Sequence, residues 1–147
     1  MNIDIVRLEV VKEKTIEYER ESLRNSLDLA NIGFKLIGNA DREIFLLICL
    51  NTKNSIIAAQ EISIGSLSSS IVHPREVFKL AILNNSASVA FLHNHPSGNT
   101  EPSRDDISIT QKLIDSGKLL GINVLDHVII GNGAFYSLLE KGACSFS

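Results

Sequence analysis

The chain has few aromatic residues: it contains no Trp, and Phe, Trp and Tyr together account for 5% of its 147 residues. Ile, Leu and Val must therefore fill the core, and a hydrophobic share of 44% is enough for one domain with a buried core. The longest apolar run, 44–50, has only the length of a strand. The sequence therefore predicts no membrane-spanning helix.

The net charge and the cysteine content are also low. The net charge of -3 and the pI near 5.8 give no electrostatic footprint for nucleic acid, so charge does not support a DNA partner. The N-terminus lacks the basic segment and apolar block of a signal peptide, and we expect a soluble, cytoplasmic protein. Cys49 and Cys144 are the only cysteines. Free thiols in a reducing compartment are favoured, and one disulfide is the alternative.

Hydrophobic periodicity predicts an α/β fold, a mixed sheet flanked by helices. Residues 6–18 alternate in part and predict one or two half-exposed strands, so we divide the chain into an N-terminal strand extension, 1–21, and a domain, 22–147. Helices are predicted from Ser22 as N-cap to Gly38, from His73-Pro74 to Asn84, and over 104–120 with Gly121 as the stop.

The strands predicted within the domain are 44–50, 55–64, 88–92, 124–130 and 135–138. The turn signals at 51–54 and 131–133 make hairpins of the first two and the last two strands. The small polar residues 66–70 predict a loop that could close over a substrate.

The segment with the most chemical information is His93-Asn94-His95, which follows the apolar run 88–92. Residues two apart on a strand point to the same face, so the two imidazoles can meet one ligand. Asp106 lies at the start of the next predicted helix, where its carboxylate can turn back towards them. Two imidazoles and one carboxylate with a fourth position open are how catalytic zinc is held.

A zinc ion in this site would lower the pKa of its water from about 15.7 to roughly 7, and a general base would still have to move the proton. Glu43, at the mouth of a buried strand, is the candidate base; Glu61 is the competitor and Glu76 a weaker one. Ser103 is the candidate donor to the oxyanion of a tetrahedral intermediate.

Each feature also has a structural interpretation. Ser103 and Asp106 have the spacing of a helix capping box, and both could serve only to start that helix. The sequence at His73 is typical of a helix entry. Asp126 and His127 resemble an acid–imidazole pair, but adjacent strand residues face opposite sides, which favours a structural or supporting role. A nucleobase deaminase is excluded, because it would need a pair of cysteines as zinc ligands.

These segments together resemble the RadC family of the JAMM (MPN, or JAB) metallopeptidase-like domains, over roughly residues 22–145. The resemblance rests on residues 93–98, 101–103, Asp106 and 124–131, supported by Glu43-Ile-Phe and by residues 73–76. The family pattern is a Glu, then His-x-His, seven residues, Ser, two residues and Asp.

The resemblance implies a JAB/MPN (cytidine deaminase-like) three-layer architecture with His93, His95 and Asp106 as zinc ligands. It also implies Glu43 as the base, in preference to Glu61, and Ser103 as the oxyanion residue. Asn94 stands where isopeptidases of the wider group usually have Ser or Thr. Longer RadC proteins carry an N-terminal helix-hairpin-helix-type region, and we expect no such DNA-binding element in the printed sequence.

The leading hypothesis is a zinc-dependent hydrolase of the JAMM type, a metallopeptidase or isopeptidase whose partner is a peptide or isopeptide-linked protein substrate. The alternative is a DNA repair or recombination accessory protein in which the metal site is structural or vestigial. A third possibility is an interaction scaffold whose site no longer has a substrate.

Overall fold

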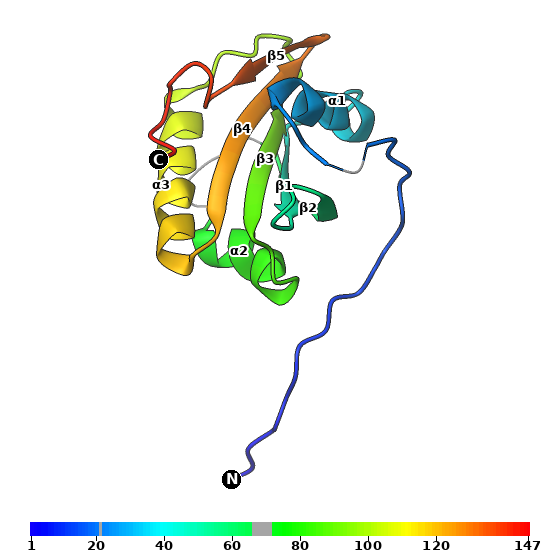
Figure 1. Ribbon diagram of the computed structural model, residues 1–147, viewed down its shortest axis with the longest axis vertical. Helices are drawn as coiled ribbons and strands as arrows, with labels where there is room; N and C mark the ends of the chain where they lie inside the picture. The colour runs from blue at the N-terminus through cyan, green and yellow to red at the C-terminus, as the bar shows by residue number, and fades with distance from the viewer. Residues whose placement is uncertain (21, 66–71) are drawn as a thin grey trace.

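A five-stranded mixed sheet forms the centre of the protein, shown as a computed structural model in Figure 1. The structure describes residues 1–20, 22–65 and 72–147. The strand order is β2-β1-β3-β4-β5; β3 and β4 run parallel, and the other neighbouring pairs are antiparallel. The strands are β1 (Ile44–Leu50), β2 (Ile56–Ile64), β3 (Ser88–Asn94), β4 (Asn123–Gly131) and β5 (Ala134–Ser137).

Helices cover both faces of the sheet and give the three-layer α/β architecture that was predicted. On one face, α2 (Pro74–Leu83) and α3 (Arg104–Leu120) enclose a core that includes Phe45, Phe78 and Leu113. On the other face, α1 (Ser26–Ile37) packs over a second core that includes Leu92 and Ile130. Figure 1 shows α1 and α3 on opposite sides of the sheet.

The five strands predicted within the domain and two of the predicted helices form within a few residues of their expected bounds. His73 is the N-cap of α2, and Ser103 is the N-cap of α3, which ends at the left-handed Gly121. Both hairpins form. Asn132 and Gly133 adopt the positive φ angles of 50° and 80° that a two-residue turn between antiparallel strands requires.

The first helix begins later than expected. Ser22 is not its N-cap; instead it forms a bridge with Ser55 at the start of the second strand of the β1–β2 hairpin. The N-cap is Asn25, whose side chain accepts a hydrogen bond from Asp28 N at 2.9 Å. The spacing of Leu23 and Leu27 is that of a helical turn, which predicts an earlier start for the helix. The contact with Ser55 instead holds the chain extended at Ser22.

The predicted strands within 6–18 are also wrong: residues 1–17 carry no helix or strand and are all exposed. In Figure 1 this segment runs away from the folded body. A strand needs a neighbour for its backbone hydrogen bonds, and the alternating pattern alone could not supply one. The predicted loop 66–70 lies outside the described residues.

Cys49 is buried, Cys144 is partly exposed, and both are free thiols, so the alternative of a disulfide is excluded. Burial raises the pKa of both thiols. Among the described residues, no helix combines the length and the apolar character that crossing a membrane requires.

Candidate metal centre

The candidate site lies where three elements end or begin together. His93 is the penultimate residue of β3, and His95 follows that strand. His93 pairs with Phe45 of β1, which places Glu43, just before β1, beside both histidines. Because β3 and β4 are parallel, the connection between them crosses the sheet as α3, and the first turn of that helix carries Asp106 to the same place.

The loop after β3 is held against the end of β4. His95 N donates to Ile130 O at 2.9 Å. Gly98 has φ +89°, and a Cβ on Gly131 would lie 3.1 Å from three backbone atoms of Gly98. Two glycines therefore allow the backbones to approach closely, and this contact fixes the position from which the His95 side chain projects.

A backbone carbonyl fixes the orientation of the His95 ring. Its Nδ1 lies 2.7 Å from Asn99 O, and since a carbonyl can only accept, Nδ1 carries the proton. Nε2 then faces Asp106 Oδ2 at 3.2 Å and Glu43 Oε1 at 3.8 Å. Its hydrogen bond with Asp106 is the main cause that raises the pKa of His95. A lone pair on Nε2 would repel two carboxylates, so this point suits a cation, either a proton or a metal ion.

His93 is fully buried, and neither ring nitrogen has a hydrogen-bond partner within the described residues. Its Nε2 lies 3.8 Å from Glu43 Oε1, and its Nδ1 lies 3.7 Å from Asp106 Oδ1. Burial lowers the pKa of His93 to about 4, so the ring is neutral near pH 7. A neutral, unpartnered imidazole between two carboxylates could bind a metal ion.

Asp106 is held rigidly at the start of α3. Its carboxylate accepts from Ser103 N at 2.8 Å, and Ser103 Oγ accepts from Asp106 N at 3.0 Å, so the predicted capping box is present. Burial opposes the charged form, but the bonds from His95 and Ser103 N outweigh it and lower the pKa of Asp106 to about 2. The carboxylate is therefore ionised and faces both histidines.

Glu43 is positioned through its backbone. Asn94 accepts from Ile44 N at 2.6 Å and donates to Arg42 O at 2.8 Å, so one buried amide holds both peptides that flank Glu43. The Glu43 side chain is 26% exposed. The two imidazoles are thus presented on one face of β3, and the residue between them fixes the glutamate from the other face.

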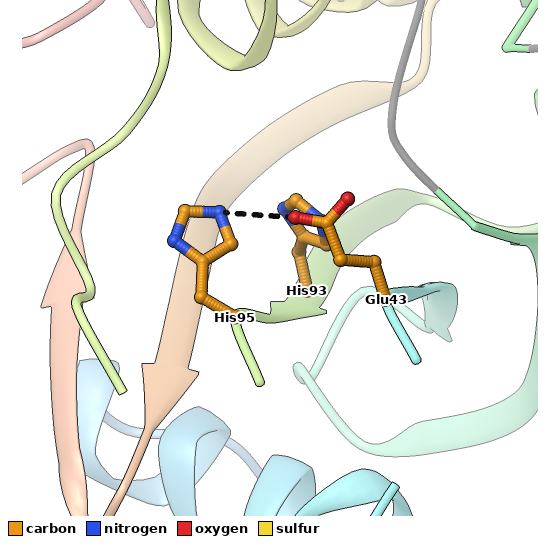
Figure 2. A group of neighbouring side chains, drawn as sticks. All are labelled: Glu43, His93 and His95. Atoms are coloured by element: carbon orange, nitrogen blue, oxygen red, sulfur yellow. Dashed lines mark ion pairs between the residues drawn. The ribbon is translucent and has the colours of Figure 1, made fainter. Parts of the chain in front are cut away.

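Figure 2 shows the Glu43 carboxylate pointing at the two imidazole rings. One ligand atom from each of Glu43, His93 and His95 lies within 4.8 Å of the other two, close enough to share a metal ion. Asp106, the predicted third ligand, is not part of this group, but its carboxylate lies 3.2 Å from His95 Nε2 and 3.7 Å from His93 Nδ1. Two carboxylates therefore face the two imidazoles, and the structure brings together all four of the residues that were predicted as ligands or base.

A second buried histidine lies beneath the site. His127 on β4 has its ring centroid 5.9 Å from that of His93. Thr110 Oγ1 donates to Asp106 O at 2.6 Å and meets His127 Nδ1 at 2.6 Å, so Nδ1 carries a proton and donates to the hydroxyl. Burial lowers the pKa of His127 to about 3. A line of contacts thus links His127 to the backbone of Asp106.

The site opens into a cleft of about 660 Å³. Ser103 lies in its wall, and because its Oγ accepts the backbone bond from Asp106, the hydroxyl proton remains free to donate into the cleft. Capping a helix and donating to a substrate are therefore compatible in this residue. The residues that line the cleft include Arg42, Glu43, His95, Ser103, Asp105 and Asp106.

The other residues that the sequence offered as a base, a ligand or a supporting acid make different contacts. Glu61 is exposed on β2, and Glu76 on α2 pairs with Lys79. His73 Nδ1 accepts from Arg75 N at 3.2 Å as the cap of α2. Asp126 bonds to the backbone N of His127 at 2.7 Å rather than to its ring.

Sequence reasoning missed two supporting contacts, the Asn94 amide on the peptides around Glu43 and the Thr110–His127 bond. Asn94 was expected to face away from the metal, and it does, but its partner lies fifty positions earlier in the chain. The spacing of Asp106 and Thr110, one helical turn, indicates that Thr110 lies next to Asp106, but it does not indicate the contact of Thr110 with His127.

The sheet order, the helices on both faces and the His-Asn-His site define an α/β domain of the JAB type. Comparison with known families agrees: the model described as "RadC-like JAB domain" matches residues 23–143. The chain therefore belongs to the RadC family.

Relatives are similar over most of this chain. UPF0758 proteins of Methanosarcina barkeri and Bacillus cereus are 47% and 52% identical to it, over 88% and 86% of its length. One from Caldanaerobacter subterraneus is 49% identical over 87%. The matched part is 57%, 57% and 55% of these three relatives, so the chain spans little more than half their length.

Proposed function

We propose that the protein is a zinc-dependent hydrolase of the JAMM type that cleaves an amide bond in a peptide or an isopeptide-linked protein. The observation that carries the proposal is the orientation of His95. Its Nδ1 is committed to the Asn99 carbonyl, and its Nε2 points between the carboxylates of Asp106 and Glu43. A backbone carbonyl behind a histidine is the usual support of a metal ligand.

The residues fit zinc. Two imidazole nitrogens and one carboxylate leave a fourth position free, and the unpartnered nitrogens of buried His93 have an explanation if one of them binds a metal. His93, His95 and Asp106 would hold the ion. When bound, zinc supplies Lewis acidity and makes water a better nucleophile at neutral pH.

The remaining steps belong to side chains. Glu43, partly exposed at the cleft, accepts the proton of the attacking water and returns it to the leaving amine. Ser103 donates its free hydroxyl proton to the oxygen that becomes negative in the tetrahedral intermediate. Asn94 keeps the Glu43 backbone in place while the proton is moved.

Hydrolysis with and without Glu43 tests the reaction. The zinc-loaded protein is assayed on a panel of fluorogenic peptide amides and ε-linked isopeptides, and Glu43→Gln is expected to lower kcat by about 10²- to 10⁴-fold. Glu76→Gln, which removes a surface carboxylate, is the matched control and keeps the rate. Full activity in Glu43→Gln, or no hydrolysis of any substrate by the wild-type protein, would contradict the proposal.

Zinc stoichiometry tests the ligand set. Asp106→Asn keeps the shape of the side chain and an acceptor for Ser103 N but removes the charge, and we expect a loss of at least tenfold in zinc affinity, measured by competition with a chromogenic chelator. Glu43→Gln is expected to bind zinc nearly as well as the wild type. If the two variants behaved in the opposite way, Glu43 would be the ligand and Asp106 the supporting carboxylate.

A further inference from the structure

The N-terminal segment exposes an unusual number of large apolar side chains. Ile3, Ile5 and Leu8 are 81%, 94% and 77% exposed, and Val6, Val10 and Val11 are exposed too. Val6, Leu8 and Val10 recur at every second position, with Arg7 and Glu9 between them. Such alternation is the pattern of a strand with one buried face.

The sheet has an edge of matching length. β2 is nine residues long and lies at one end of the strand order, so only β1 pairs with it among the described residues. Ile57 and Ile64 on this strand are 42% and 58% exposed. A long edge strand with exposed apolar residues and open backbone groups is a template for one more strand.

Within one copy, the fold does not bring the N-terminal segment and the β2 edge together. Tyr18 packs against the α1 core, and Arg20 pairs with Asp28 of α1 at 3.0 Å. These contacts turn the chain onto the helix just before it reaches the hairpin, and residues 3–11 continue away from the body (Figure 1). The segment therefore leads away from the folded body rather than along its own β2.

We propose that residues 3–11 add a strand to the β2 edge of a second copy of this chain, which returns its own segment to the first copy. Each copy has one alternating segment that pairs with none of the described residues, and β2, at nine residues, is the longer of the two edge strands of its sheet. A two-fold exchange satisfies both at once and forms a closed dimer, whereas a different partner would leave one of the two uncovered. The side chains of Val6, Leu8 and Val10 would then lie together on one face of the extended sheet.

Molar mass in solution tests the exchange. The full chain is expected to have twice its 16.1 kDa mass in light scattering after size exclusion, at micromolar concentration. The triple variant Val6→Asn, Leu8→Asn, Val10→Asn is expected to have the single mass. Residues 6, 8 and 10 are exposed in the single copy, so the variant keeps the thermal unfolding curve of an isolated domain.

The double variant Arg7→Gln, Glu9→Gln is the matched control, because it changes the other face of the same segment without changing net charge; it should remain a dimer. Amide hydrogen exchange should show protection of residues 3–11 and of the β2 edge in the wild type and loss of both in the triple variant. A monomeric wild type overturns the proposal. This holds even if residues 3–11 are protected from exchange, because they would then pair with the sheet of their own copy. A triple variant that stays dimeric overturns it as well.

Discussion

The two sides of the candidate metal centre are built differently. On the α3 side, Asp106 is fixed by its bonds to Ser103 and His95, and its helix is tied through Thr110 to the buried His127. On the β1 side, the Glu43 carboxylate lies 3.8 Å from both histidines, and only its backbone is held, by Asn94. Folding fixes the Asp106 carboxylate in place, whereas the Glu43 carboxylate is free to rotate.

This difference matches the two roles that we propose. A metal ligand gains affinity when its position is fixed before the ion arrives, whereas a base must move a proton between water and a leaving group. The rigid side should therefore control stability and metal affinity. The other side should control the rate, with a small effect on stability.

The largest expected effect on stability is acid destabilisation of the metal-free protein. Burial lowers the pKa of His93 to about 4 and that of His127 to about 3, below the ordinary value of about 6.5. The unfolded chain therefore takes up protons first as the pH falls, and stability present above about pH 6.5 is lost towards pH 4 and pH 3. Each histidine contributes on the order of 3 kcal/mol to this loss.

Urea unfolding of the metal-free protein between pH 7 and pH 4 measures this loss. His127→Asn removes one titrating group and should make the pH dependence shallower by about one proton. His73→Asn, at the cap of α2, controls for the loss of a histidine as such. An unchanged slope in His127→Asn would mean that the buried ring is not responsible.

A smaller effect is expected for Thr110→Val. The substitution keeps the shape of the side chain but leaves buried His127 Nδ1 without an acceptor, which costs about 1–3 kcal/mol. Thr110→Ser keeps the hydroxyl and should lose less. Chemical denaturation of the three proteins gives the values, and equal stability of Thr110→Val and wild type would show that the α3 side is not tied through this contact.

The smallest effect on stability is expected for Asn94→Ser, about 1 kcal/mol, because the serine hydroxyl can both donate and accept but its shorter side chain replaces the two bonds only in part. The comparison of the two sides predicts that this variant retains zinc but hydrolyses the peptide panel about tenfold more slowly, since the base is less well positioned. Loss of zinc with an unchanged rate per bound metal would reverse the roles of the two sides.

Local signals predicted much of this architecture. The apolar run 44–50 could be little else than a buried strand, and Ser103 and Gly121 mark the two ends of α3 as its caps. The spacing of His93, His95 and Asp106 placed three chemical groups at the ends of consecutive elements. In each case the residues that decide the outcome lie close together in the chain.

The features that could not be predicted depend on distant partners. Ser22 leaves the helical pattern because Ser55 bridges it, and the amide of Asn94 acts on the peptides next to Glu43. Residues 3–11 show the opposite case: the alternation of a strand is present, but a pattern cannot say which sheet will accept it.

The pairing of Phe45 with His93 also means that the site needs a long-range contact before it can form. Glu43 and Asn94 are separated by a long stretch of chain, so closing that loop costs entropy before any contact at the site can repay it. A slip of one residue between β1 and β3 would turn the imidazoles towards α1. We therefore expect the site to form late in folding, after the sheet has found its register, so that binding of a metal ion would report correct folding.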